Sequence, residues 1–228
     1  RCSRDWSSDV CSSDLSTIDY YRILNELAQA QLGGHHSANL LLRSIDYHEI
    51  KSRYYARWDE IPALLEAELR AFAALGPDCL VLCNNTLHKA YDAIAPRLAL
   101  PVPVIHAVDA TARAALAKGA RRVLLLGTKF TMEDGFYHRG LERHGLSVAT
   151  PGEADRAEIQ RIQSQLARGG MQPGFRAYLA ALVDRHEADA VVLACTELPL
   201  ALSQADVAMP VVSPTECQCR EAFAFATA

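Results

Sequence analysis

The sequence predicts an α/β fold made of two similar lobes, each built on a parallel sheet. Short apolar runs of strand length alternate along the chain with longer helical patterns. Several of these runs are apolar at every position, as in strands that are buried on both faces of a parallel sheet. One segment of the first half also recurs in the second half, which indicates an internal duplication.

Composition fits this fold and disfavours several other classes. The chain has 228 residues, 50% of them hydrophobic, and a formal net charge of -4, which suits one large domain or two small ones. We find no basic run typical of nucleic-acid binding, no apolar stretch near the ~20 residues of a spanning helix, and no signal peptide. The seven cysteines favour reduced thiols in the cytoplasm, and the isolated pair Cys217 and Cys219 favours helix positions over a zinc site.

The first residues differ in character from the rest of the chain. Residues 1–15 are rich in Ser and Asp, lack a helical or strand period and begin with Arg, so we interpret them as non-native. From residue 16 onward the apolar positions follow the period of an amphipathic helix, which Ser16 or Thr17 can cap.

The remaining elements follow from the same two patterns, taken in order along the chain. Gly33 and Gly34 favour the end of the first helix. We predict strands at residues 38–45, 79–83, 103–105, 122–126, around 148, 190–194 and 210–212. We predict helices at residues 58–75, 87–98, 110–118, 132–143, 156–167 and 175–186.

The duplicated segment indicates where a site would lie. Residues 78–86 align with residues 189–197, and each segment is followed by a helix-sized stretch and then by a strand that starts at Pro103 or Pro210. Each lobe would therefore bring a strand end and a helix N-terminus to one cleft, because ligands of open α/β sheets bind at the carboxyl ends of the strands. The alignment pairs Asn84 with Cys195.

Cys195 is the first candidate for chemistry. It follows a buried strand and precedes an expected helix start, where backbone N–H groups and the positive helix end would lower the pKa of its thiol. Thr196 offers a hydroxyl and an amide to an anionic ligand. Glu197 either orients a ligand amine or complements the helix dipole. The alternative for Cys195 is a buried structural cysteine.

The matching segment of the first half offers a second cluster. Asn85 and Thr86 place backbone amides at a helix start, where they either cradle a carboxylate or serve only as caps. His88, in the first turn of that helix, is better explained by a structural role.

A third strand end adds Thr128 and Thr131 after Gly127, a residue that permits a tight turn. Their hydroxyls either bind a ligand or, at Thr131, cap a helix. Ser44, at the end of an early strand, is a weaker candidate for substrate binding.

These motifs resemble those of the aspartate/glutamate racemase family, within the Asp/Glu/hydantoin racemase superfamily. The similarity runs from about residue 16 to residue 209. Residues 194–197 (ACTE) match one family signature completely, and residues 85–88 match most of the other. The resemblance implies two α/β lobes with the active site in the cleft between them. We expect residues 1–103 and 211–228 to form the first lobe and residues 104–210 the second.

The resemblance also implies a homodimer and chemistry without pyridoxal phosphate, another cofactor or a metal. In such enzymes a cysteine thiolate removes the α-proton from one face of the substrate, and an opposite thiol returns a proton to the other face. Cys195 fits one of these roles, but Asn84 occupies the position of the other cysteine, and Asn cannot transfer protons. Cys83 lies one residue earlier, on the opposite face of the strand. Residues 1–15 stand in place of the Gly-rich opening strand of the family.

We expect a racemase that interconverts L and D forms of aspartate or glutamate. One alternative is a lyase, decarboxylase or isomerase that acts on a small dicarboxylate with one cysteine, because decarboxylation needs only one proton donor. Another is a protein that binds a small acid without turnover. Each takes a small amino acid or dicarboxylate, and we expect neither a nucleic acid nor a membrane as a partner.

Overall fold

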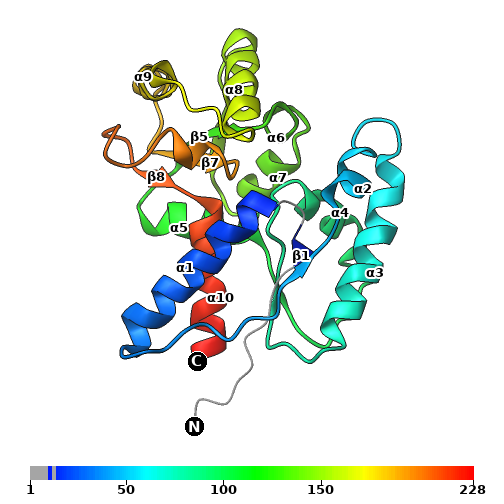
Figure 1. Ribbon diagram of the computed structural model, residues 1–228. Helices are drawn as coiled ribbons and strands as arrows, with labels where there is room; N and C mark the ends of the chain where they lie inside the picture. Colours follow the sequence, from blue (N-terminus) through cyan, green and yellow to red (C-terminus); the bar gives the residue numbers. More distant parts are fainter. Residues whose placement is uncertain (1–9, 12–13) are drawn as a thin grey trace. The chain divides into compact units, whose positions relative to one another are not determined.

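The structure is a computed structural model that describes residues 10–11 and 14–228, with side chains from residue 16 onward (Figure 1). Its contacts divide the chain into two units. The first unit runs to Ala107 and resumes from Gln218 to Ala228, and the second is Val108–Cys217. All strand pairs are parallel in the described part of the chain, which confirms the expected α/β class.

The second unit contains a four-stranded sheet. Its order is β6 (Ser147–Ala149), β5 (Arg122–Gly127), β7 (Ala190–Ala194) and β8 (Val211–Val212). Alternate strand residues point to opposite faces, as the strand period of two requires. Leu124 and Leu193 face α8 (Glu153–Leu166) and α9 (Pro173–Asp184). Leu125 and Val192 face α5 (Ala107–Ala117) and α7 (Phe136–Glu142), so both faces are covered.

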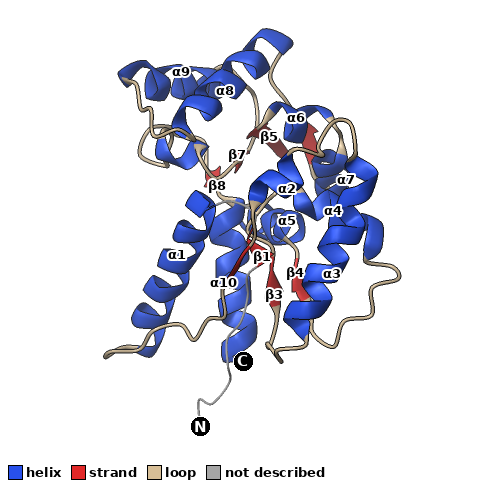
Figure 2. Cartoon of the chain, turned by 45° about the vertical axis from the view of Figure 1, so that its right-hand side comes forward, coloured by secondary structure: helices blue, strands red, loops and turns tan. Residues whose placement is uncertain are grey.

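The first unit contains two pairs of short strands, visible in Figure 2. Strand β1 (Val10–Cys11) pairs with β2 (Arg43–Ser44), and β3 (Leu80–Val81) pairs with β4 (Val104–Ile105). Around β3, Leu80 and Leu82 pack against α3 (Ile61–Ala73) and α4 (Leu87–Ile94). Val81 and Cys83 pack on the other face against α1 (Asp14–Leu32) and α10 (Pro214–Thr227).

The internal duplication extends to the hydrogen-bond register. In the first unit Leu80 pairs with Val104, and the Leu80 N–H donates to the Pro103 carbonyl at 2.8 Å. In the second unit Val191 pairs with Val211, and the Val191 N–H donates to the Pro210 carbonyl at 2.9 Å. Since Leu80 aligns with Val191, the two strand pairs are equivalent, residue by residue.

Several expected elements differ from the observed ones. The strand expected at 38–45 is limited to β2, and α2 (Tyr47–Lys51) and the 3-10 helix η1 (Trp58–Glu60) follow it. The helix expected at 132–143 is two helices, α6 (Lys129–Glu133) and α7, because Gly135 between them has a φ of 84° and interrupts the helical backbone.

We find no strand period in residues 1–15, but Val10–Cys11 in that segment forms β1 and α1 begins in it at Asp14. Our interpretation of residues 1–15 as non-native stays a prediction, and residues 1–9 and 12–13 lie outside the described residues. No helix in the described part of the chain is both long and apolar enough to cross a membrane.

Candidate active site

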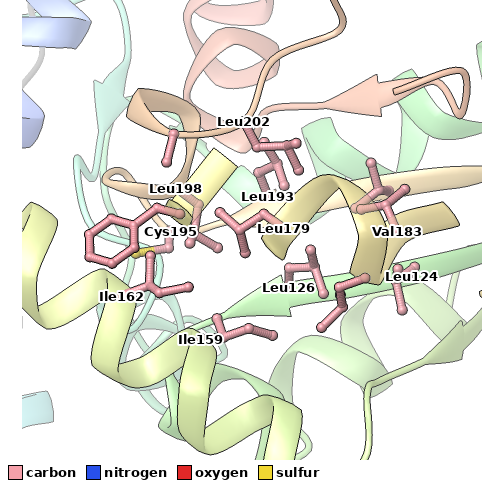
Figure 3. Packing of buried hydrophobic residues seen from close by; sticks show 14 of the residues in the cluster. Leu124, Leu126, Ile159, Ile162, Leu179, Val183, Leu193, Cys195, Leu198 and Leu202 are labelled. Atoms are coloured by element: carbon pink, nitrogen blue, oxygen red, sulfur yellow. The ribbon is translucent and has the colours of Figure 1, made fainter. Parts of the chain in front are cut away.

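Cys195 directly follows β7, and its side chain lies on the face of the second unit's sheet that α8 and α9 cover. It follows Val191 and Leu193 at alternate positions, so its side chain joins the apolar cluster under α8 and α9, close to Ile162 and Leu198 (Figure 3). The residue is only 5% exposed. A buried thiol of this kind is shielded from bulk water, which suits chemistry on a weakly acidic C–H bond.

The Cys195 thiol has polar partners despite this apolar setting. Its Sγ donates to Oε2 of Glu197 at 2.7 Å, and the Thr196 hydroxyl donates to the same oxygen at 3.0 Å. Glu197 therefore accepts from both residues that precede it, and these three side chains form one hydrogen-bonded group.

The expected lowering of the Cys195 pKa is wrong. Burial, followed by the charge and the hydrogen bond of the Glu197 carboxylate, raises the pKa of the thiol well above its ordinary value. The amides of Glu197 and Leu198 act in the opposite direction but do not outweigh these causes. The helix after Cys195 is only the three-residue 3-10 helix η2 (Leu198–Leu200), which provides a weak dipole. Cys195 therefore rests as a protonated thiol.

The neighbouring strand β5 ends beside this group. Gly127 pairs with Ala194, and a Cβ at Gly127 would lie 3.0 Å from the Ala194 carbonyl oxygen, so a larger residue would crowd that backbone. Thr128 follows as the N-cap of α6: its hydroxyl accepts the Thr131 N–H at 3.1 Å and lies 2.9 Å from the Thr131 hydroxyl. The cap is thus Thr128, and the expectation of a cap at Thr131 is wrong. Thr131 is buried, while Thr128 remains half-buried.

In the first unit, Asn84 takes the structural place of Cys195. Its side-chain oxygen accepts the Leu87 N–H at 3.0 Å at the start of α4. The duplicated segments align Leu87 with Leu198, whose backbone amide is one of the two that act to lower the pKa of the Cys195 thiol. The Asn84 amide and the Cys195 thiol therefore occupy equivalent positions in the two turns.

The other residues of this turn differ in exposure. Asn85 is half-buried, and Thr86 is buried and forms the N-cap residue of α4 without a side-chain cap bond. Cys83 packs on the opposite face of β3, as expected from the strand period, under α1 and α10. Ser44 is exposed in β2.

Sequence reasoning missed one residue that holds this turn. The buried Ser16 hydroxyl donates to the Cys83 carbonyl at 3.0 Å. Ser16 was considered only as a cap of its own helix. Because the contact joins residues distant in sequence, no local pattern could identify it.

His88 has the structural role expected for it. It is fully buried, its Nε2 accepts the Ala107 N–H at 3.4 Å, and its ring lies 4.3 Å from that of His106. Burial, with the neighbouring His106, lowers the pKa of His88 well below its ordinary value. In the described part of the chain no group of three or more His, Cys, Asp or Glu side chains is arranged to hold a metal ion.

Comparisons with known proteins agree with these features. The family model described as Asp/Glu/Hydantoin racemase matches residues 10–222. The broad specificity amino-acid racemase RacX of Bacillus subtilis is 26% identical over 182 residues, covering 77% of this chain and 71% of RacX.

Two solved structures are similar over nearly the whole chain. A Yersinia pestis protein provisionally described as an Asp/Glu racemase shares 32% identity at a TM-score of 0.87, covering 98% of this chain and 100% of that one. An aspartate racemase homologue from Pyrococcus horikoshii OT3 shares 28% identity at a TM-score of 0.87 with the same coverage. The match of the family model to most of the sequence shows that the chain belongs to the Asp/Glu/Hydantoin racemase family.

Proposed function

We propose that this protein is an amino-acid racemase that interconverts L and D forms of aspartate or glutamate without a cofactor, with Cys195 as its acid/base residue. The observation that carries the proposal is the buried Cys195 thiol, hydrogen-bonded to Glu197 at the end of β7. A relative named as a broad specificity amino-acid racemase supports an amino-acid substrate.

The Cys195–Glu197 pair can supply the base that the reaction needs. Transfer of the thiol proton to the Glu197 carboxylate leaves a thiolate and a carboxylic acid, with the total charge unchanged. The thiolate then takes the α-proton of the substrate, and the bonding electrons remain on the α-carbon, delocalised into the substrate carboxylate. Return of a proton to the same face regenerates the starting amino acid, whereas return to the other face inverts it.

Hydrogen-bond donors must stabilise the carboxylate while it carries this extra charge. Thr196 and Thr128, both half-buried at neighbouring strand ends, are the donors we propose in the second unit. Asn85 and Thr86, at the start of α4, are those we propose in the first unit. That both groups serve one substrate, in a cytoplasmic homodimer, stays a prediction.

One observation favours a second candidate function. Asn84 stands in register with Cys195, and its amide oxygen is already engaged as the cap of α4. An amide is too weak an acid and base to transfer protons catalytically at neutral pH, so inversion lacks the second acid that two-base racemisation uses. A reaction that needs one proton donor, such as decarboxylation or isomerisation of a small dicarboxylate, would require only Cys195.

The test is proton NMR of L- and D-aspartate and L- and D-glutamate in deuterated buffer, with the wild-type protein and Cys195→Ala. We expect the α-proton signal to disappear with the wild type and to persist with Cys195→Ala. Chiral chromatography of the same samples then measures the opposite enantiomer.

The outcomes separate the candidate functions. Exchange that depends on Cys195, accompanied by inversion, supports the racemase. Exchange of one enantiomer without inversion supports one-base chemistry. If a folded wild-type sample exchanges none of the four acids, the racemase proposal is refuted, and small dicarboxylates are assayed next for loss of CO₂ or isomerisation.

A further inference from the structure

The start of α1 contacts the end of β3 through a buried hydroxyl that the proposed chemistry does not use. Ser16 lies in the first turn of α1 and is only 2% exposed. Its hydroxyl donates to the Cys83 carbonyl at 3.0 Å, across 67 positions of the sequence. Cys83 directly precedes Asn84, so this hydrogen bond acts on the first peptide of the turn that leads into α4.

The hydrogen bond from Ser16 fixes more than one backbone atom. The Cys83 carbonyl and the Asn84 N–H belong to one planar peptide, so a bond that holds the carbonyl also sets the direction of that N–H. The other end of the turn is fixed by the Asn84 side chain, whose oxygen accepts the Leu87 N–H at 3.0 Å. Residues 85 and 86, which we propose as donors to the substrate carboxylate, lie between these two bonds.

The next turn of α1 is held by buried polar contacts as well. The Tyr20 hydroxyl donates to Oε1 of Gln218 at 2.5 Å. The Gln218 amide donates in turn to the Ile105 carbonyl, at the end of β4, at 2.5 Å. Tyr20 and Gln218 are both buried, so water does not compete strongly for these bonds. Two successive turns of α1 are therefore tied to buried partners, and Ser16 has little freedom to move away from Cys83.

The second unit has a similar arrangement at its own strand end. Ala194 aligns with Cys83, and Thr131, in the first turn of α6, lies close to the Ala194 carbonyl. A Cβ at Gly127 would lie 3.0 Å from that carbonyl oxygen and 3.1 Å from Cγ2 of Thr131. Thr131 is buried, as Ser16 is. In each unit a buried hydroxyl residue at a helix start thus lies beside the carbonyl that precedes the turn.

We infer that Ser16 is a positioning residue: by holding the Cys83 carbonyl, it keeps the turn at residues 84–86 in the arrangement that receives the substrate carboxylate. This inference rests on the proposed function, because that function assigns the turn to substrate binding. Without the Ser16 bond the peptides of the turn gain freedom, and substrate binding must order them again. Loss of the bond therefore weakens binding more than it slows the chemical step.

The experiment measures kcat and KM for α-proton exchange with Ser16→Ala, which removes the hydroxyl that donates to the Cys83 carbonyl. We expect KM to rise about three- to tenfold, the equivalent of one buried hydrogen bond. The value of kcat should stay within about twofold, because proton transfer is assigned to Cys195 and Glu197. Ser16→Cys keeps nearly the same volume and offers a weaker donor, so its KM should lie between those of the wild type and Ser16→Ala. It gives a result even if Ser16→Ala does not fold.

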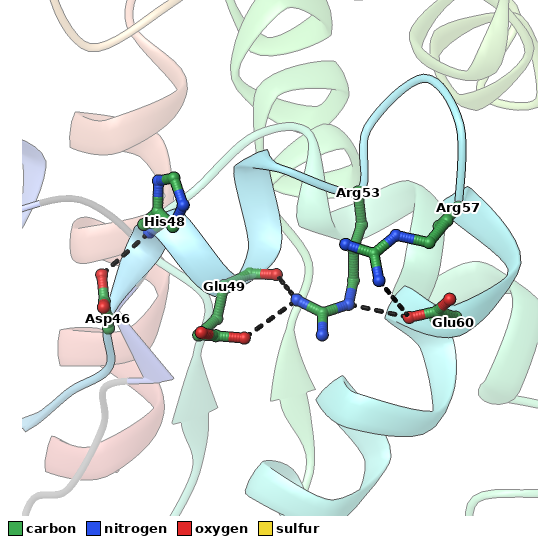
Figure 4. A network of polar contacts seen from close by, with 6 residues as sticks. All are labelled: Asp46, His48, Glu49, Arg53, Arg57 and Glu60. Carbon is green, nitrogen blue, oxygen red and sulfur yellow. Dashed lines mark hydrogen bonds and ion pairs between the residues drawn. The ribbon is translucent and has the colours of Figure 1, made fainter.

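Asp46→Ala is the control that separates positioning from a general loss of stability. The exposed Asp46 carboxylate accepts the His48 N–H at 3.0 Å and caps α2. Figure 4 shows this cap in the same polar network as the ion pairs of Arg53 with Glu49 and Glu60. Removing a helix cap lowers stability, as removing the Ser16 bond does, but it leaves the Cys83 carbonyl untouched. Asp46→Ala should therefore lower the melting temperature and leave KM unchanged.

Two results would overturn the inference and leave the racemase proposal standing. One is a wild-type KM in the folded Ser16 variants. The other is an equal rise in KM with Asp46→Ala, which would mean that KM follows overall stability and not the Ser16 bond. If the wild type itself shows no exchange with any of the four acids, the proposed function fails, and this inference fails with it.

Discussion

Replacing Asn84 with cysteine tests whether the missing second thiol is what limits inversion. The duplicated segments place residue 84 in register with Cys195, and the backbone N–H groups of Leu87 and Leu198 are equivalent. A thiol at residue 84 should therefore take the position that the Asn84 amide holds now. It would supply a group able to return a proton to the substrate.

The structure indicates what this change costs in stability. Asn84 accepts the Leu87 N–H at 3.0 Å, and Thr86 provides no cap bond, so residue 84 caps α4. Losing a cap of this kind costs about 1 kcal/mol, which corresponds to a melting temperature lower by roughly 2–4 °C in a chain of this size. A sulfur still accepts weakly, so Asn84→Cys should lose less than this.

The assay is the ratio of inversion, from chiral chromatography, to α-proton exchange, from NMR. A positioned acid or base contributes about 10²- to 10⁴-fold, so we expect Asn84→Cys to raise inversion at least about 10²-fold while exchange changes little. Asn84→Ser is the matched control, because its hydroxyl can cap α4 and it adds no thiol.

Two results would refute this reasoning. One is a folded Asn84→Cys protein whose ratio of inversion to exchange equals that of the wild type, which would mean that residue 84 does not reach the substrate. The other is an equal gain with Asn84→Ser, which would mean that the thiol is not the cause.

Three further predictions follow from the buried groups. Cys195→Ser should lower α-proton exchange by about 10²- to 10⁴-fold with an unchanged melting curve, since a hydroxyl is a much weaker acid; an active Cys195→Ser protein would exclude Cys195 as the base. Because the Cys195 thiol has a raised pKa and passes its proton to Glu197, Glu197→Gln should lower exchange near neutral pH and leave a rate that climbs with pH, since the thiol then ionises only to solvent; a Glu197→Gln protein as active as the wild type at pH 7 contradicts it. The pKa of His88 is lowered in the folded protein, so as pH falls the unfolded chain binds a proton before the folded protein does. The free energy of unfolding should therefore decrease by up to about 1.4 kcal/mol per pH unit below about pH 6.5. Urea titrations at pH 7 and pH 5 should show a smaller decrease for His88→Gln than for the wild type.

The sequence was most informative where apolar runs are continuous. β7 was predicted at its observed bounds and β5 to within one residue, because a strand buried on both faces leaves an unbroken run. The alignment of Asn84 with Cys195 also depended on these continuous apolar runs, because two similar runs can be aligned residue by residue. By contrast, β1 and β2 each have two residues and leave no period to detect.

The electrostatics of the site could not be predicted in the same way. A cysteine before a helix start suggested a lowered thiol pKa. The actual pKa depends on how deeply Cys195 is buried and on the orientation of the Glu197 carboxylate. Both are properties of tertiary packing. The contact of Ser16 was hidden for the same reason, since its partner Cys83 lies on a different element.

The equivalent positions of Asn84 and Cys195 in the two turns have an evolutionary consequence. Selection for a stable fold acts on whether such a turn is held, and both residues hold it through hydrogen bonds of their own: Asn84 accepts the Leu87 N–H, and Cys195 donates to Glu197. A lineage can therefore exchange one for the other with little loss of stability, and under the proposed function its chemistry would change from two-sided to one-sided proton transfer. Stability measurements across such relatives would not register the change, and only the stereochemistry of their products would.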